Sequence, residues 1–265
     1  MAYLSLSTRD LNVLEKIQDP EYDPSSVVQV DESLPKDPNV TDVTEYGRIA
    51  AEERTIVMDL QQAEFQLAGL RPKAEADPLD LYEKCVAALT KLISANSSYA
   101  SARNNRVQAN RRLFGDGVLV AGVEPFDSPL IARPDSEEKK SVGSRILLDL
   151  DTCISLLTPE GPKPRLSRHA AKTLSSAHTQ RAAIYLQTSK MLARGGVLDV
   201  APERKEASWQ KIDFEEAASL DFALGGRYGN DIAKGLAVST NPTAKLCGQI
   251  VREAMKKEYG PAFTI

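Results

Sequence analysis

The feature that most constrains this chain is a pair of adjacent amphipathic segments between Asp77 and Asp116. In the first segment the apolar residues are spaced by 4, 3, 1 and 3 positions, which is one face of a helix; they are Leu81, Cys85, Ala88, Leu89 and Leu92. Asp77 and Pro78 suit the start of this helix, and Asn96 suits its end. The second segment aligns Ala102, Asn105, Ala109 and Leu113, with Ser97 or Ser98 as its expected cap. The stretch therefore predicts a helical hairpin.

The apolar face of the first segment recurs farther along the chain. Moving each of its positions by 65 gives Ile146, Leu150, Cys153, Ile154 and Leu157, which are all apolar. A further 64 gives Gln210, Phe214, Ala217, Ala218 and Asp221, where only the central three keep the pattern. Repeats at a fixed period are typical of solenoids, in which each unit buries its apolar face by stacking on the next. We therefore expect an all-α solenoid of helix pairs with insertions.

Three stretches carry a resemblance to a known family. Asn104-Asn105-Arg106 followed by Gly115-Asp116 is typical of the first helix of a tetratricopeptide repeat. Together with the head at residues 10–17 and the tail at residues 241–247, the chain resembles the tetratricopeptide repeat protein 36 family, a group of small three-repeat proteins. The resemblance spans most of the chain, which departs from the pattern by its long insertions and by one extra residue between Asn105 and Gly115.

The expected fold is a right-handed superhelical α-solenoid of three such helix pairs. An N-terminal arm with a short helix would occupy residues 1–41, and one repeat domain residues 42–260. Repeat 1 would span residues 42–96, repeat 2 residues 97–159 with an insertion at 117–143, and repeat 3 residues 166–223, followed by capping helices at 226–259. The arm is either flexible or docked on the solenoid through Leu11, Leu14 and Ile17. The resemblance favours docking of the first 18 or so residues.

Finer local predictions concern the insertion and the last helix. We expect the apolar half of the insertion to pack on the surface and its charged half, from Arg133 to Lys140, to be mobile, with the next helix beginning at Ser144. A β-hairpin in the apolar half is conceivable. The last helix is expected to turn Leu246, Cys247, Ile250, Val251 and Ala254 inward. Three questions stay open. They are whether residues 117–143 and 196–206 are ordered, what occupies the groove, and whether the protein associates beyond the expected monomer.

Composition and motifs exclude several classes of function. A net charge of −4 provides no basic field for nucleic acid, and no apolar run reaches the roughly 18 residues of a membrane span. The N-terminus lacks a signal peptide, and three scattered cysteines indicate a reducing compartment, so we expect a cytoplasmic protein. No GxxxxGK, HExxH, GxSxG or CxxC motif is present. His169 and His178 are nine residues apart on one predicted helix, which does not suit a shared metal. We expect no enzyme activity, no cofactor and no metal.

The candidate site residues are Asn104, Asn105 and Arg181. Arg181 falls on the apolar stripe of a helix predicted from Ser167 to Arg194, so it needs an acceptor. The acceptor is either an internal carbonyl or carboxylate, or the carboxylate of a bound peptide. The resemblance implies a concave groove where chaperone-binding relatives hold a terminal carboxylate with Lys, Arg and Asn. Asn104 and Asn105 match two of these carboxylate-holding positions by residue type; alternatively, they form hydrogen bonds to neighbouring helices. The lysines of the clamp are missing, and Ser176 occupies one of their positions.

Two functional hypotheses follow. The first, which the resemblance implies, is a non-catalytic adaptor of co-chaperone type that binds another protein or peptide in the groove, with a chaperone of the Hsp70 class as the expected partner. The second is a scaffold that stabilises a cytosolic metabolic enzyme through the insertion at residues 117–143. An enzyme with an unrecognised site is the least favoured reading. The identity of the partner is not encoded in any motif of the chain.

Overall fold

The structure is a computed structural model, and it describes residues 28–70, 77–160 and 165–259. Its helices are α2 (Val43–Leu67), α3 (Pro78–Ala95), α4 (Ala100–Phe114), α5 (Ser136–Leu157), α6 (Arg168–Leu192), α7 (Lys211–Arg227), α8 (Asp231–Thr240) and α9 (Pro242–Tyr259). A short 3₁₀ helix, η2 (Lys205–Ser208), precedes α7. The predicted all-α class is therefore confirmed. The short helix expected near Thr8–Gln18 lies outside the described residues.

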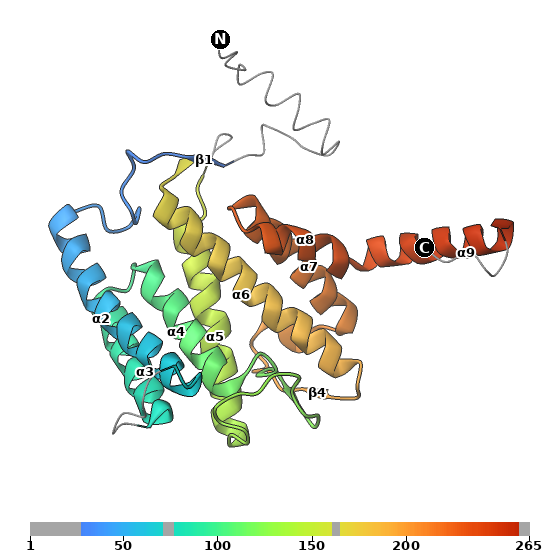
Figure 1. Ribbon diagram of the computed structural model, residues 1–265, viewed down its shortest axis with the longest axis horizontal. Coiled ribbons are helices and arrows are strands. Elements are labelled where there is room, and N and C mark those ends of the chain that lie inside the picture. Colours follow the sequence, from blue (N-terminus) through green and yellow to red (C-terminus); the bar gives the residue numbers. More distant parts are fainter. Residues whose placement is uncertain (1–27, 71–76, 161–164, 260–265) are drawn as a thin grey trace, which may run out of the picture.

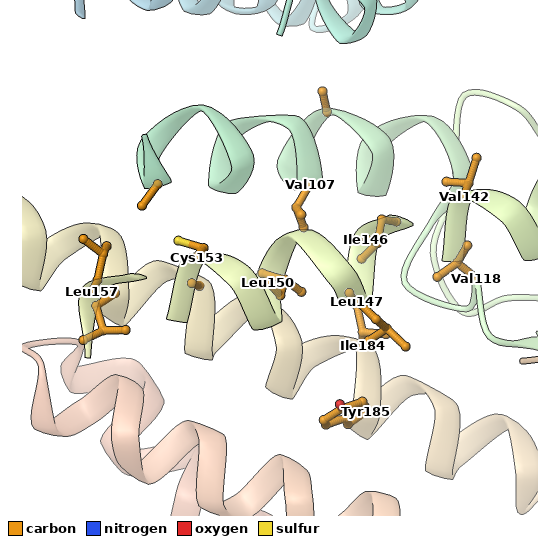
Figure 2. Packing of buried hydrophobic residues seen from close by; sticks show 14 of the residues in the cluster. Val107, Val118, Val142, Ile146, Leu147, Leu150, Cys153, Leu157, Ile184 and Tyr185 are labelled. Atoms are coloured by element: carbon orange, nitrogen blue, oxygen red, sulfur yellow. The ribbon is translucent and has the colours of Figure 1, made fainter. Parts of the chain in front are cut away.

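Each helix from α2 to α8 packs against the next one along the chain, so the molecule is a row of antiparallel neighbours (Figure 1). Contacts also join α2 to α4 and α4 to α6, the alternate members of the row. The main apolar cluster lies between α4, α5, α6 and α7, where Val107, Leu150 and Ile184 point toward one another (Figure 2). Ile146 and Phe214, from two copies of the repeated apolar face, are buried in this cluster, and Leu81, from the first copy, packs against it.

Two short β-ladders connect segments that are distant in the sequence. β1 (Gln29–Val30) pairs in parallel with β3 (Arg165–Leu166), next to the start of α6. β2 (Val120–Ala121) pairs in antiparallel fashion with β4 (Val197–Leu198). The apolar half of the insertion is therefore ordered, and its Val118, Leu119 and Val120 are buried as predicted on apolar grounds. The expectation of a hairpin within that half is wrong, because β2 pairs with β4, which begins 77 residues after β2.

The charged half of the insertion differs from the prediction. Asp135 accepts hydrogen bonds from the N–H groups of Glu137 and Glu138, at 3.0 and 3.2 Å, and so caps α5 at Ser136. The expectation that Arg133 to Lys140 is mobile is wrong from Ser136 on, because an aspartate cap and acidic residues in the first turn stabilise a helix end. The connection between α4 and α5 thus spans residues 115–135.

The start of α4 also differs from the prediction. Its N-cap is Tyr99, which makes no side-chain capping bond, and neither Ser97 nor Ser98 caps the helix. Asp37, from residues 28–41, accepts a hydrogen bond from the Ala100 N–H at 3.4 Å instead. Asn39 donates to the Leu156 carbonyl at 2.9 Å, so this part of the predicted arm is fixed against α4 and α5. By contrast, Asp77 caps α3 as predicted, and Asp42 caps α2 in the same way.

The last helix extends away from the row (Figure 1). Its apolar stripe faces outward, with Leu246, Ile250 and Val251 more than half exposed. The expectation that these residues point inward is wrong, as it is for Cys247, because α9 meets α7 and α8 only near its beginning. Cys85 and Cys153 are buried as expected.

Candidate functional site

Asn105 connects α4 to α2. Its side-chain amide donates to Glu53 Oε1 at 2.8 Å, and the Tyr99 hydroxyl donates to Glu53 Oε2 at 2.6 Å. Glu53 is buried, so these two donors satisfy a carboxylate that would otherwise lose its solvation. Burial and the neighbouring Glu53 charge raise the pKa of Tyr99, which keeps the phenol protonated as a donor.

Asn104 bonds in the opposite direction, toward α6. Its amide donates to Ser176 Oγ at 3.3 Å, and the Gln180 amide donates to Asn104 Oδ1 at 2.8 Å. Gln180 also accepts from Arg111 Nη1 at 3.2 Å. Asn104 and Asn105 therefore act as bonds between helices, which was one of the two interpretations that the sequence allowed.

Arg181 of α6 lies between two acidic residues, Asp151 of α5, which is partly exposed, and Asp221 of α7, which is buried. It donates in bidentate fashion to Asp221, through Nε at 2.7 Å and Nη2 at 2.8 Å, and its Nη1 donates to Asp151 at 2.7 Å. The ring of His178 contacts the same Asp221 carboxylate at 2.8 Å. Burial by itself would raise the pKa of Asp221, but the hydrogen bonds from Arg181 and His178 outweigh it and hold that pKa below its usual value.

The network continues from Asp151 toward the segment before α7. Asp151 accepts from Arg204 at 2.8 Å, and Arg204 in turn donates to the buried Glu206 at 2.9 and 3.0 Å. The Tyr185 hydroxyl completes the arrangement by donating to Glu206 at 2.7 Å. These ion pairs fasten the 196–210 connection, which is thereby ordered, to the body of the protein.

The three predicted site residues do not form one carboxylate clamp. Asn105 faces Glu53 of α2, Asn104 faces Gln180 of α6, and Arg181 faces Asp221 of α7, and the three share no hydrogen-bond partner. The internal acceptor considered for Arg181 is present. The part that these residues play toward an outside partner stays a prediction.

A groove of about 730 Å³ separates α2 from α4. Both of its arginines are already paired, because Arg111 is bidentate to Asp116 at 2.6 and 2.9 Å and Arg112 donates to Glu64 at 2.8 Å, while Asp127 accepts from the Asp116 N–H at 2.7 Å. Its other lining residues include apolar and amide side chains, namely Val57, Leu60, Gln61, Asn105, Gln108, Ala109 and Pro129. The exposed Gln61 and Gln108 form no side-chain hydrogen bond within the described residues, so each offers a free donor and a free acceptor.

A second groove, of about 770 Å³, lies between α6 and the turn that joins α7 to α8. Its lining combines apolar, hydroxyl and basic side chains, including Val30, Arg168, Ala171, Lys172, Ser176, Thr179 and Ile232. The alternate helices thus border the two grooves in pairs, α2 with α4 for the first and α6 with α8 for the second. The surface therefore suits a polypeptide, whose backbone groups need amide and hydroxyl partners and whose apolar side chains need shallow cover.

Sequence reasoning missed the acids that hold the buried cations. Asp149 accepts from Arg106 through two bonds of 2.8 Å and from Arg103 at 3.1 Å, and no residue of this triad was singled out beforehand as an ion pair. Asp221 did leave a signal, because it occupies a position where the repeat otherwise has an apolar residue. A charged residue at such a position indicates a buried partner of opposite charge.

The described residues lack both a membrane-spanning helix and a cluster of metal ligands. No helix among them is long and apolar enough to cross a membrane. The same part of the chain contains no group of three or more His, Cys, Asp or Glu side chains that could hold a metal ion.

Comparison with known proteins places the chain in a family. No family model matches it, and no solved structure matches it. The L-tyrosine degradation gene cluster protein hmgX of Aspergillus fumigatus is 34% identical over 258 residues, which cover 96% of this chain and 93% of that protein. Identity at this level along almost the whole of both chains shows common descent, and the chain therefore belongs to the hmgX family.

Proposed function

We propose that the chain is a non-catalytic cytoplasmic adaptor that holds another polypeptide on the surface bordered by α2, α4, α6 and α8. The proposed architecture is a right-handed solenoid of three tetratricopeptide-like helix pairs, α2 with α3, α4 with α5, and α6 with α7, followed by capping helices. Support comes from the packing of each helix on its successor and from the contacts between alternate helices. The groove between α2 and α4 carries the proposal, because its two arginines are already paired and the amides of Gln61 and Gln108 are free.

The proposed partner is an enzyme of tyrosine degradation. The observation that favours this class is the relative hmgX, which is named as a protein of an L-tyrosine degradation gene cluster. It agrees with the hypothesis of a scaffold for a metabolic enzyme. The insertion offers a second contact there, because Phe126 is 45% exposed and lies under the Arg194 guanidinium at 3.5 Å.

A chaperone of the Hsp70 class stays a prediction from the family resemblance. The internal bonds of Arg181 and Asn105 argue against the carboxylate clamp that would support it, because Asp221 and Asp151 already neutralise the Arg181 guanidinium and Glu53 takes one N–H of Asn105. An enzyme partner does not require such a clamp.

The test is co-purification from cells that degrade tyrosine, using the tagged chain and single variants. Gln108→Arg fills the α2–α4 groove without removing an internal bond, and we expect it to reduce recovery of the tyrosine-degrading enzyme at least tenfold. Phe126→Ala tests the insertion separately, and Gln249→Arg on α9 is the matched control for added charge. Equal recovery of the enzyme with all three variants, or no such enzyme with the unaltered chain, would refute the proposal.

A further inference from the structure

The groove between α6 and α8 is accessible and partly apolar. Ile232, at the start of α8, is 76% exposed, and Val30, from β1, is 53% exposed. Ala171 and Tyr228 also line this groove. Side chains of this kind gather at one site when another apolar segment covers them, because an uncovered apolar surface is unfavourable in water.

We propose that residues 8–18 of this same chain dock in the α6–α8 groove. The described chain begins at Val28, which is buried, and the next two residues form β1 beside the start of α6. The Asp31 N–H adds a bond of 2.8 Å to the Leu166 carbonyl. Because Val30 itself lines the groove, the described chain begins beside the groove.

Length and pattern agree with this occupant. The groove follows α6 from Arg168 to Gln180, which is a distance of about 18 Å at the helical rise per residue. The sequence of residues 8–18 predicts a helix of about 16 Å with Leu11, Leu14 and Ile17 on one face. The nine residues 19–27 can span up to about 30 Å, which is enough to reach either end of the groove.

Charge also agrees. Residues 8–18 are balanced in charge, with Arg9 and Lys16 against Asp10 and Glu15, whereas the connection at residues 19–27 holds three acidic residues, Asp19, Glu21 and Asp23, and no basic residue. The groove presents Arg168 and Lys172 against one acid, Asp231. Arg168 is shared with Glu32 at 2.7 Å, whereas Lys172 forms no ion pair within the described residues. An acidic segment that enters beside β1 passes these two cations first.

Docking has a consequence that rests on the proposed function. The α6–α8 half of the surface would be closed to an outside partner, and the α2–α4 groove would remain open. The docking itself does not depend on that function, since it needs only the segment and the groove.

Disulfide trapping in the full chain tests the proposal. Leu14→Cys is combined with Ser176→Cys in a Cys247→Ser background, because Cys247 is exposed and the other two native cysteines are buried. Mild oxidation should give a linked monomer in most molecules, identified by non-reducing gel and peptide mass spectrometry. The control pair joins Leu14→Cys to Leu148→Cys, an exposed position on α5 outside the groove, and should link at least tenfold more slowly.

Three outcomes overturn the docking. They are the absence of a 14–176 link, a link at position 148 of equal rate, and a link between two molecules whose yield rises with concentration, which would make a second copy the occupant. Hydrogen exchange gives an independent readout. The double variant Leu11→Asp, Leu14→Asp should speed exchange in residues 229–233 several-fold, whereas the control Leu4→Asp should not. Equal exchange in the unaltered chain and both variants would also refute the docking. Both measurements use the purified chain without a partner, so their failure leaves the adaptor proposal standing.

Discussion

Replacement of Asp221 by Asn is the sharpest test of how the buried charges hold the helices together. Asp221 is 3% exposed and accepts two hydrogen bonds from Arg181 and one contact from His178. Asn keeps the size of the side chain but removes its charge and turns one acceptor into a donor that faces the guanidinium. Arg181 would then retain only Asp151 as an anionic partner.

The expected loss follows from the burial of this pair. Removing one partner of a buried ion pair costs about 3–5 kcal/mol, because the remaining charge has lost its water and its counter-charge. We expect the free energy of unfolding to fall by that amount. For a chain of this length each kcal/mol lowers the melting temperature by about 2–4 °C, so Tm should drop by roughly 10 °C.

The assay is urea unfolding followed by circular dichroism, with Glu52→Gln as the control. Glu52 forms an exposed pair with Arg48 at 3.8 Å, and exposed pairs contribute at most about 1 kcal/mol. The double variant Asp221→Asn, Arg181→Met should lose less than the sum of its single variants, because they share one interaction. A loss for Asp221→Asn no larger than that for Glu52→Gln would refute this account of the network.

Four further predictions use the same unfolding assay or a simple labelling experiment. Leu150→Ala should cost about 2–5 kcal/mol because Leu150 is fully buried, whereas Leu148→Ala, two residues away and 58% exposed, should change stability by less than about 0.5 kcal/mol; equal losses would contradict the helix orientation. Gly225→Ala should cost about 1–3 kcal/mol, because its Cβ would lie 2.6 Å from Thr179 Oγ1, while Gly47→Ala, with nothing within 4 Å, should stabilise α2; the reverse order would contradict this packing of α6 on α7. The pKa values of Glu64, Glu206 and Asp221 are lowered in the folded state. Their contribution to the free energy of unfolding is therefore complete above the unfolded pKa of about 4 and is lost as the pH falls below it. Unfolding curves between pH 3 and 7 should show this loss of stability, and a smaller loss for Asp221→Asn. Iodoacetamide at pH 8 should label Cys247 alone, because burial raises the pKa of Cys85 to about 11 and of Cys153 to about 12, and early labelling of either buried thiol would be inconsistent with this fold.

The candidate site shows where residue type ceases to be informative. Asn104, Asn105 and Arg181 each make specific hydrogen bonds to a neighbouring helix. Their sequence context also allowed a peptide as the acceptor. The choice among acceptors depends on which acids lie within about 3 Å. Asp221 is 40 residues from Arg181 along the chain, and Glu53 is 52 residues from Asn105.

The sequence by itself determined the helical class and the starts of several helices. Asp42 and Asp77 cap their helices within three residues, and the 3.6-residue period shows which face of α3 and α5 is apolar. These signals are local, so they can be interpreted without knowledge of the rest of the fold.

Only the tertiary structure decided what covers each face and satisfies each polar group. Asp37 accepts from the first N–H of α4 across 63 residues, and β2 joins the insertion to a strand after α6. The stripe of α9 is as regular as that of α3, yet it remains exposed because no described neighbour packs over Leu246 or Ile250. Periodicity identifies an apolar surface, whereas its burial depends on the free energy of packing against a partner that the local pattern does not specify.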